Sequence, residues 1–333
     1  MDFSMARVLA ARQRLAGIAD STPLIPSVLS ERFGQNLLLK LEIAQPIGAF
    51  KLRGAVSAIF NLEGPVKGVT CCSTGNHGRG VAFAARARGI PAVVCMSRIA
   101  PEAKVAGVRA LGAEARIIGQ SQDDAQAEAE RLVSEEGFTE VSPFDDPDVI
   151  AGQGTIGLEL LEARPDLDTI LVPLSGGGLA GGVAFVAKCI NPKVRVIGIT
   201  MDRGAAMHAS IREGRPVEVP EVPSLADSLG GGIGLNNRLS FPLCRDYLDD
   251  IVLVTEEEIY RALQAVYFED RIVCEGACVV GIAALLAGKI ALRGPTATII
   301  TGRNLEMTQH AAIMAGHDIQ LGDYTVKGAV YEP

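Results

Sequence analysis

The sequence predicts an α/β protein in which parallel sheets are covered by helices. Short apolar runs rich in β-branched residues alternate with longer amphipathic windows along most of the chain, which is the pattern of repeated β-α units. The chain has 333 residues, of which 48% are hydrophobic, and this is enough to build two lobes. Glycine-rich or polar loops stand between several of the runs and the helices that follow them.

The first half of the chain opens its regular pattern with a hydrophobic run at residues 37–43. Three β-rich runs then precede helical windows: 68–73 before 80–88, 91–96 before a helix that begins near Pro101, and 113–118 before a polar helix at 123–136. Proline is favoured in the first turn of a helix, which supports the start near Pro101.

The second half repeats the same pattern. The expected strands and helices are 169–174 before 179–190, 194–200 before 205–213, 251–255 before 256–270, and a last strand at 296–300. The helix at 256–270 has acidic residues in its first turn, where the helix dipole favours negative charge.

Three segments interrupt the pattern. Residues 140–148 contain two prolines and three aspartates and are the expected crossing between the lobes. Residues 213–223 contain three prolines and are expected on the surface. After about His317 the periodicity fades, which predicts a tail or an arm that contacts a partner.

Composition and charge exclude several classes of partner. The formal net charge is −8 and no basic stripe is visible, so neither nucleic acid nor an acidic membrane is expected to bind. The seven cysteines lie mostly in apolar runs, and no paired CxxC motif indicates zinc. Without a signal segment or a long apolar stretch, the expected location is the cytoplasm.

Lys51 lies between the apolar run at 37–43 and an apolar helix, directly after Ala49 and Phe50. Partial removal from water at such a boundary lowers the pKa of an amine and makes it a usable nucleophile and base. Most lysines are simply solvated, so Lys51 alone decides little. Together with the two loops described next, it indicates an amine that holds a phosphorylated aldehyde as a Schiff base.

The first loop, Ser73-Thr74-Gly75-Asn76-His77-Gly78, lies between a strand and a helix. Its Ser, Thr and Asn residues suit helix capping. The same geometry exposes amides and hydroxyls that can hold a carboxylate, and an Asn side chain there can donate to a phenolate oxygen. The two interpretations are compatible.

The second loop, Gly176-Gly177-Gly178-Leu179-Ala180-Gly181, follows a strand and opens a helix. It fits the dinucleotide-binding pattern, and Asp202 stands about where a ribose-binding acid is placed. Backbone amides at a helix N-terminus bind any phosphate, and a purely structural tight turn is the alternative. The Lys51 and Asn76 segments favour pyridoxal phosphate, because a dehydrogenase has no use for them.

Thr301-Gly302-Arg303-Asn304 follows the last strand and could be an ordinary turn. In a pyridoxal phosphate site, a hydroxyl there would face the pyridine nitrogen. Unlike a carboxylate, it would not keep that nitrogen protonated, so the ring would be a weaker electron sink. This favours elimination of a β-substituent over transamination.

Taken together, these motifs resemble the fold-type II pyridoxal-phosphate enzymes, and specifically the serine/threonine dehydratase and serine racemase family. The resemblance runs from about Arg12 to Asn304 and includes residues 143–147 and 150–155. It implies two parallel-type α/β lobes with the active site between them. Residues 1–65 plus 147–333 would form the large cofactor-binding domain and residues 66–146 the small domain. The resemblance also implies a homodimer.

The resemblance assigns a role to each motif. Lys51 would be the catalytic residue and would carry the cofactor. The other cofactor-binding residues would be Phe50 beside the ring, Asn76 at the phenolic oxygen, Gly176, Gly177, Gly178 and Leu179 at the phosphate, and Thr301 at the pyridine nitrogen. The substrate carboxylate would be held by Ser73, Thr74, Asn76 and His77, largely through backbone amides.

Some positions depart from the family pattern. Thr74 stands where the racemases carry a second catalytic serine, which weakens a racemase interpretation. Thr200 and Ala206 replace the family's metal-binding acids, so no metal is expected. Ser228 replaces a glycine, and Arg303 replaces a small residue close to the cofactor ring.

The expected activity is β-elimination of water from a 3-hydroxy amino acid, giving an oxo acid and ammonia. Residues 203–208, 224–234 and 302–304 look most like the dehydratases of ectoine and hydroxyectoine utilisation, which implies a hydroxylated diaminobutyrate substrate. The lack of a regulatory domain after the lobes favours a catabolic role. A general L-threonine or L-serine dehydratase is the alternative. Serine racemase, a β-replacement synthase and a non-catalytic relative are further alternatives.

Overall fold

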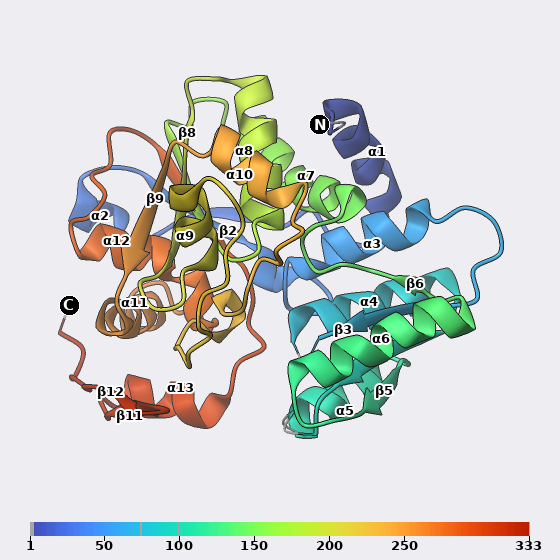
Figure 1. The fold of residues 1–333 in the computed structure, drawn as a ribbon. Coiled ribbons are helices and arrows are strands. Elements are labelled where there is room, and N and C mark those ends of the chain that lie inside the picture. Colours follow the sequence, from blue (N-terminus) through green and yellow to red (C-terminus); the bar gives the residue numbers. More distant parts are fainter. Residues whose placement is uncertain (1–2, 74, 99, 101, 333) are drawn as a thin grey trace.

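The computed structural model describes residues 3–332 apart from 74, 99 and 101. Within these residues, the strands form a six-stranded sheet, a four-stranded sheet and a C-terminal hairpin. Figure 1 shows the four-stranded sheet with its helices beside the larger body that holds the six-stranded sheet. Neighbouring strands are parallel in both sheets except for one edge pair. The predicted α/β class is therefore confirmed.

The six-stranded sheet has the order β1-β2-β10-β7-β8-β9. Its strands are β1 (Leu24–Pro26), β2 (Leu37–Leu41), β7 (Thr169–Pro173), β8 (Arg195–Met201), β9 (Asp250–Val254) and β10 (Thr296–Ile300). Only β1 runs antiparallel to its neighbour. Every residue of β7 and β10 is buried, as expected for central parallel strands covered on both faces.

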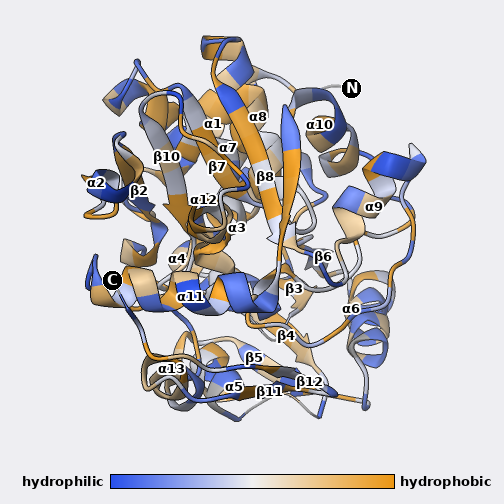
Figure 2. Cartoon of the chain, turned by 90° about the vertical axis from the view of Figure 1, so that its left-hand side faces the viewer, coloured by the Kyte–Doolittle hydropathy of each residue, from blue (hydrophilic) through white to orange (hydrophobic). Residues whose placement is uncertain are grey.

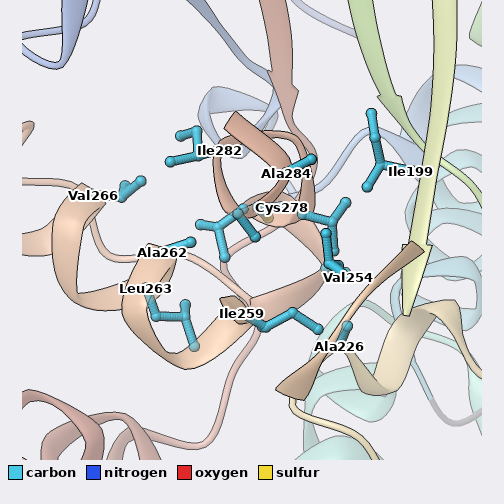
Figure 3. Packing of buried hydrophobic residues seen from close by; sticks show 14 of the residues in the cluster. Ile199, Ala226, Val254, Ile259, Ala262, Leu263, Val266, Cys278, Ile282 and Ala284 are labelled. Carbon is cyan, nitrogen blue, oxygen red and sulfur yellow. The ribbon is translucent and has the colours of Figure 1, made fainter. Parts of the chain in front are cut away.

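Alternate residues of these strands face two different layers of helices. Leu37 and Leu39 belong to the core on one face, and Leu38 belongs to the core on the other. The first face is covered by α11 (Glu256–Phe268) and α12 (Val280–Leu286), whose packing is seen in Figure 3. The second face is covered by α7 (Pro147–Ala163), α8 (Gly178–Ile190) and α10 (Ser240–Tyr247). α1 (Met5–Leu15) packs on the outside of α7.

The four-stranded sheet is parallel and has the order β5-β4-β3-β6. Its strands are β3 (Val69–Cys72), β4 (Ala92–Met96), β5 (Glu114–Ile117) and β6 (Thr139–Glu140), and its helices are α4 (Asn76–Arg88), α5 (Glu102–Ala110) and α6 (Gln122–Glu136). Val93 and Cys95 pack against α6, whereas Val94 and Met96 belong to the core shared with α4. In Figure 2, β3, β4 and β8 are largely hydrophobic, whereas α6 and α11 carry hydrophilic surfaces.

Helix α3 (Lys51–Asn61) lies between the two sheets, packed against α4 on one side and α7 on the other (Figure 1). The approach is close at its first turn. A Cβ on Gly80 would lie 3.2 Å from the carbonyl oxygen of Lys51, and one on Gly152 would clash with the carbonyl of Arg53. The start of α3 is therefore held by backbone contacts from both neighbouring helices.

The remaining short elements connect these layers. They are α2 (Ser30–Phe33), α9 (Ala206–Glu213), α13 (Met307–Met314), η1 (Glu42–Ala44), η2 (Asp227–Leu229), η3 (Gly276–Cys278), β11 (Ile319–Leu321) and β12 (Tyr324–Val326). The last stretch is not a free tail, because β11 and β12 pair as an antiparallel hairpin. Two side chains of α11 also hold it, since Gln264 donates to the carbonyl of Ala329 and Tyr260 donates to the carbonyl of His317. Among the described residues, every helix is too short or too polar to cross a bilayer.

The division into domains at residues 65/66 and 146/147 stays a prediction. The strands of the four-stranded sheet lie between residues 69 and 140. Helix α3 precedes that range in the sequence and yet shares a hydrophobic core with it, through residues such as Leu52 and Val56.

Candidate active site

Lys51 is the first residue of α3, and its amine donates a hydrogen bond to the carbonyl of Pro143 at 2.7 Å. The ring of Phe50 lies beside it, with 5.5 Å between Nζ and the ring centroid. Burial lowers the pKa of Lys51 to about 8. A large fraction of the amine is therefore unprotonated at a mildly alkaline pH, as a nucleophile or base requires.

A buried ion network fixes the turn that carries Lys51. Arg53 is 1% exposed and binds Glu42 at 2.8 Å and Glu159 at 2.6 Å, and Glu159 also pairs with Lys40. Burial opposes the charge on Arg53, but the two carboxylates outweigh it and raise its pKa. Because Glu42 lies in η1 and Glu159 in α7, the network ties the first turn of α3 to two other elements.

Thr301 lies next to Lys51 through main-chain pairing. The amide of Phe50 donates to the carbonyl of Thr301 at 2.9 Å, and Ala49 forms a β-bridge with Gly302. The Thr301 side chain is buried, and its Oγ1 lies 3.3 Å from Sγ of Cys278. That sulfur also accepts from the amide of Gly302 at 3.1 Å and donates to its carbonyl at 2.9 Å.

Asn76 begins α4 and is joined to two segments from the other side of the molecule. Its Nδ2 lies 3.0 Å and 3.1 Å from the two carboxyl oxygens of Glu275. Its Oδ1 accepts from Nδ2 of Asn304 at 2.6 Å. Glu275 is 4% exposed, and burial raises its pKa although three donors, from Asn76, Asn304 and Ser228, point to it.

The rest of the predicted carboxylate loop lies at the N-terminus of α4. The Ser73 hydroxyl accepts from the amide of Gly75 at 3.2 Å. The His77 ring is buried and bonds the carbonyl of Val141 at 2.7 Å through Nε2. Burial and the nearby Lys51 charge lower its pKa to about 3, so the ring is neutral and the substrate-binding role expected of His77 rests on its backbone amide. Thr74 lies outside the described residues.

The glycine loop begins α8. Gly177 has φ of 88°, a conformation that favours glycine, and a Cβ there would lie 2.6 Å from Cε of Met207. Gly176 and Gly178 leave no room for a Cβ beside Phe144. The first-turn amides of α8 have no acceptor within the helix and are therefore available to an anion.

Residues 143–144 connect the glycine loop with the amine. The carbonyl of Pro143 accepts from Lys51, and Phe144 packs on Gly176 and Gly178. The structure thus brings the Lys51, Asn76, glycine-loop and Thr301 segments together in one site at the border between the two sheets. The roles assigned to these residues stay predictions.

Comparison with known proteins identifies the family. Residues 16–302 match the family described as pyridoxal-phosphate dependent enzyme. The chain belongs to this family. The predicted fold type, enzyme class and cofactor are thereby confirmed.

Its relatives carry related names. A protein of Sinorhizobium fredii provisionally named threonine dehydratase is 51% identical and covers 95% of this chain and 96% of its own length. An L-threonine ammonia-lyase of Thermotoga maritima is 42% identical, over 89% of this chain and 74% of its own length. The catabolic L-threonine dehydratase of Escherichia coli is 38% identical, covering 92% and 94%.

Solved structures agree in fold. Maize serine racemase superposes with a TM-score of 0.89 at 32% identity and covers 95% of this chain and 98% of its own. The processed form of tomato (Solanum lycopersicum) threonine deaminase isoform 2 gives 0.87 at 33% identity, covering 93% and 87%.

The residues present fit pyridoxal phosphate. The Lys51 amine has a pKa of about 8, which suits bonding to an aldehyde. The Gly178 end of α8 offers amides to a phosphate, and the Thr301 hydroxyl is buried beside a thiol rather than a carboxylate. A pyridine nitrogen facing Thr301 would therefore have a neutral partner.

Four contributors to the site were missed from the sequence: the Pro143 carbonyl, Glu275, Cys278 and Asn304. The sequence offered one usable signal, a glutamate and two cysteines within the apolar stretch 272–280. A buried carboxylate needs partners, so this glutamate could have been assigned to a polar site. Asn304 was noted only as part of the Thr301 turn, and a backbone carbonyl leaves no signal in the sequence.

The metal positions carry no acids in this chain. Thr200 is buried and lies 3.4 Å from the sulfur of Met201, and Ala206 is buried as well. Within the described ranges, no group of three or more His, Cys, Asp or Glu side chains is arranged to hold a metal ion. The expectation that no metal binds stays a prediction.

Proposed function

We propose that this protein is a threonine dehydratase of the ammonia-lyase type, which removes water from L-threonine or L-serine to release an enamine that water hydrolyses to an oxo acid and ammonia. The observation that carries the proposal is the Lys51 amine, with a pKa of about 8, in one site with the buried hydroxyl of Thr301. The names of the relatives support the same activity. They favour this general dehydratase over the hydroxyectoine-specific enzyme expected first from the sequence.

Most of the predicted site residues have a task in this proposal. Lys51 binds the cofactor and, once free, takes the proton from the substrate α-carbon. The first-turn amides of α4, with Ser73, hold the substrate carboxylate. Bound pyridoxal phosphate supplies the electron sink that stabilises the α-carbon after proton loss. Gly176, Gly177, Gly178 and Leu179 hold its phosphate, Asn76 its phenolic oxygen and Phe50 its ring.

Thr301 selects the type of reaction. Its hydroxyl is neutral and lies beside the Cys278 thiol, so Thr301 itself would not hold a proton on the pyridine nitrogen as a carboxylate would. A weaker electron sink favours rapid loss of the β-hydroxyl over transamination. The residues Gly176 to Leu179 would hold the cofactor phosphate, which would supply the proton for the leaving hydroxyl, as the family resemblance implies.

The test is release of ammonia and oxo acid by the purified, cofactor-loaded protein. L-threonine and L-serine are expected to turn over, and Lys51→Ala should lower the rate by about 10²- to 10⁴-fold. Full turnover by Lys51→Ala would disprove the assignment of the base. D-serine formation without ammonia would indicate a racemase instead.

A hydroxylated diaminobutyrate is the second candidate substrate. The likeness of residues 203–208, 224–234 and 302–304 to the hydroxyectoine dehydratases motivates it. Two departures from the family pattern lie close to the site, since Ser228 donates to Glu275 at 3.3 Å and Arg303 lies against Gly48, just ahead of Lys51. Turnover of the diamino substrate with no turnover of L-threonine would establish it. Ser228→Gly and Arg303→Ala would then be expected to shift the preference toward L-threonine.

We also propose a homodimer located in the cytoplasm. The family resemblance supports the dimer, and the cysteines placed mostly in apolar runs support a reducing compartment. The molecular mass in solution, measured by light scattering, tests the dimer, and a mass near the 34.9 kDa of one chain would contradict it.

A further inference from the structure

We propose that Glu275 and Asn304 are positioning residues that fix the side-chain amide of Asn76, so that one of its N–H groups faces the cofactor. The inference rests on the proposed contact between Asn76 and the phenolic oxygen of pyridoxal phosphate. An asparagine amide can present either its donor or its acceptor end, and only the donor end suits a phenolate. The surrounding residues decide which end is presented.

The oxygen end of Asn76 is set through Asn304. Nδ2 of Asn304 donates to the carbonyl of Ile47 at 2.9 Å, and a carbonyl can only accept, so the orientation of the Asn304 amide is determined. The same nitrogen donates to Oδ1 of Asn76 at 2.6 Å. The oxygen of Asn76 is therefore directed at Asn304.

The nitrogen end is set by Glu275. Nδ2 of Asn76 lies 3.0 Å and 3.1 Å from the two oxygens of this carboxylate, which selects a donor. Two oxygens of one carboxylate subtend a narrow angle at the nitrogen, much smaller than the angle between two amide hydrogens. One hydrogen therefore serves both oxygens, and the second is left for a ligand.

Glu275 itself is held rigidly. It accepts from the amide of Asn304 at 2.7 Å and from the Ser228 hydroxyl at 3.3 Å. A Cβ on Gly302 would lie 2.5 Å from its Oε1, so the carboxylate is packed against the turn that carries Thr301. A carboxylate that accepts one hydrogen of an amide also polarises the other, which strengthens its bond to a phenolate.

The experiment measures the dissociation constant of pyridoxal phosphate, by titrating the cofactor-free full-length chain and following the long-wavelength absorption of the bound cofactor. Loss of a hydrogen bond to a charged oxygen predicts that Asn76→Ala weakens binding about tenfold. Glu275→Gln should weaken it about threefold to tenfold, because glutamine no longer dictates which end of Asn76 it meets.

The decisive comparison is a double-mutant cycle. In the Asn76→Ala background, Glu275→Gln should have almost no further effect on cofactor binding. If the two substitutions weakened cofactor binding independently, so that their fold-changes multiplied, the proposal would be overturned. If Asn76→Ala fails to fold, Asn76→Leu, which keeps the volume, takes its place in the cycle.

Glu256 provides a matched control. It is buried, burial raises its pKa, and it accepts from the amide of Leu225 at 2.8 Å rather than from Asn76 or Asn304. Glu256→Gln should leave cofactor affinity unchanged. An effect as large as that of Glu275→Gln would mean that both substitutions act by destabilising the protein in general. Cofactor binding that follows the cycle without turnover of threonine would overturn the proposed function alone. Turnover of threonine, combined with independent effects of Asn76→Ala and Glu275→Gln on cofactor affinity, would overturn the positioning role alone.

Discussion

Lys51 shows how burial prepares a single side chain for chemistry. Among the described residues its amine donates to the Pro143 carbonyl, and no carboxylate offsets its burial. Removal from water therefore lowers the pKa, and the nearby Cys71 offsets this only in part. An ordinary surface lysine at neutral pH is almost entirely protonated and could neither bond an aldehyde nor accept a proton.

The first prediction follows from that pKa of about 8. The neutral amine is the reactive form, so the rate at which Lys51 captures added pyridoxal phosphate should rise with pH and reach half its maximum near pH 8. The measurement is the rate of appearance of the cofactor absorption band between pH 6 and about 10. A half-maximum above pH 10, the value of a solvated lysine, would mean that the amine is not desolvated.

The second prediction concerns Cys278, whose sulfur bonds both the amide and the carbonyl of Gly302. Cys278→Ala leaves the buried amide of Gly302 without its partner, whereas the Gly302 carbonyl keeps the amide of Glu275 at 3.0 Å. The free energy of unfolding should therefore fall by about 1–3 kcal/mol. Denaturant unfolding measures the loss, and weaker cofactor binding should accompany it because Thr301 lies in the same turn. Cys189→Ala, at an exposed cysteine, should change neither quantity.

For single site residues, the sequence predicts only those that belong to short contiguous motifs. Lys51, Asn76 and the triple glycine belong to short motifs whose residue types carry their own chemical meaning. Glu275 contacts Asn76, which lies about two hundred positions away in the sequence. Cys278 contacts Thr301, which lies about twenty positions away. Such pairings come from the packing of the sheets and leave no local pattern.

Helix ends were predictable at the level of single elements because their signals are local. Thr255 and Glu258 form a reciprocal capping box at the start of α11, where acidic residues were expected. Ser121 and Asp124 do the same for α6. Helix α7 was not predicted, and residues 150–155 were noted only as a family motif, because the helix is buried on nearly every side and shows no amphipathic period.

Helix α3 depends on the buried charge of Arg53, which yields the third prediction. Arg53→Met leaves Glu42, 0% exposed, without its cation, so unfolding should require about 3–5 kcal/mol less. Equilibrium unfolding in urea measures the difference. Arg164→Ala, which removes an ion pair with the exposed Asp166, should cost less than about 1 kcal/mol, and equal losses would mean that the network adds nothing special.

The architecture of the whole molecule followed from strand and helix alternation, but the membership of α3 did not. Its apolar side chains join the core of the four-stranded sheet, whereas Arg53 ties it to η1 and α7 of the other lobe. Sequence periodicity reports that a face is buried and not which partner buries it. The proposed boundary at residue 65 places α3 in the large lobe.

Native-state hydrogen exchange tests that boundary. Sub-global unfolding releases cooperative units one after another, and the four-stranded sheet, with short edge strands such as β6, should open at a lower denaturant concentration than the six-stranded sheet. We expect amides of α3 to keep their protection when those of β3 and β4 lose it, because the Arg53 ion pairs hold the helix to α7. Loss of protection in α3 together with β3 would move the boundary to residue 50, so that Lys51 would belong to the smaller unit. Arg53→Met should produce that same behaviour, since it leaves α3 attached to the large lobe by packing alone.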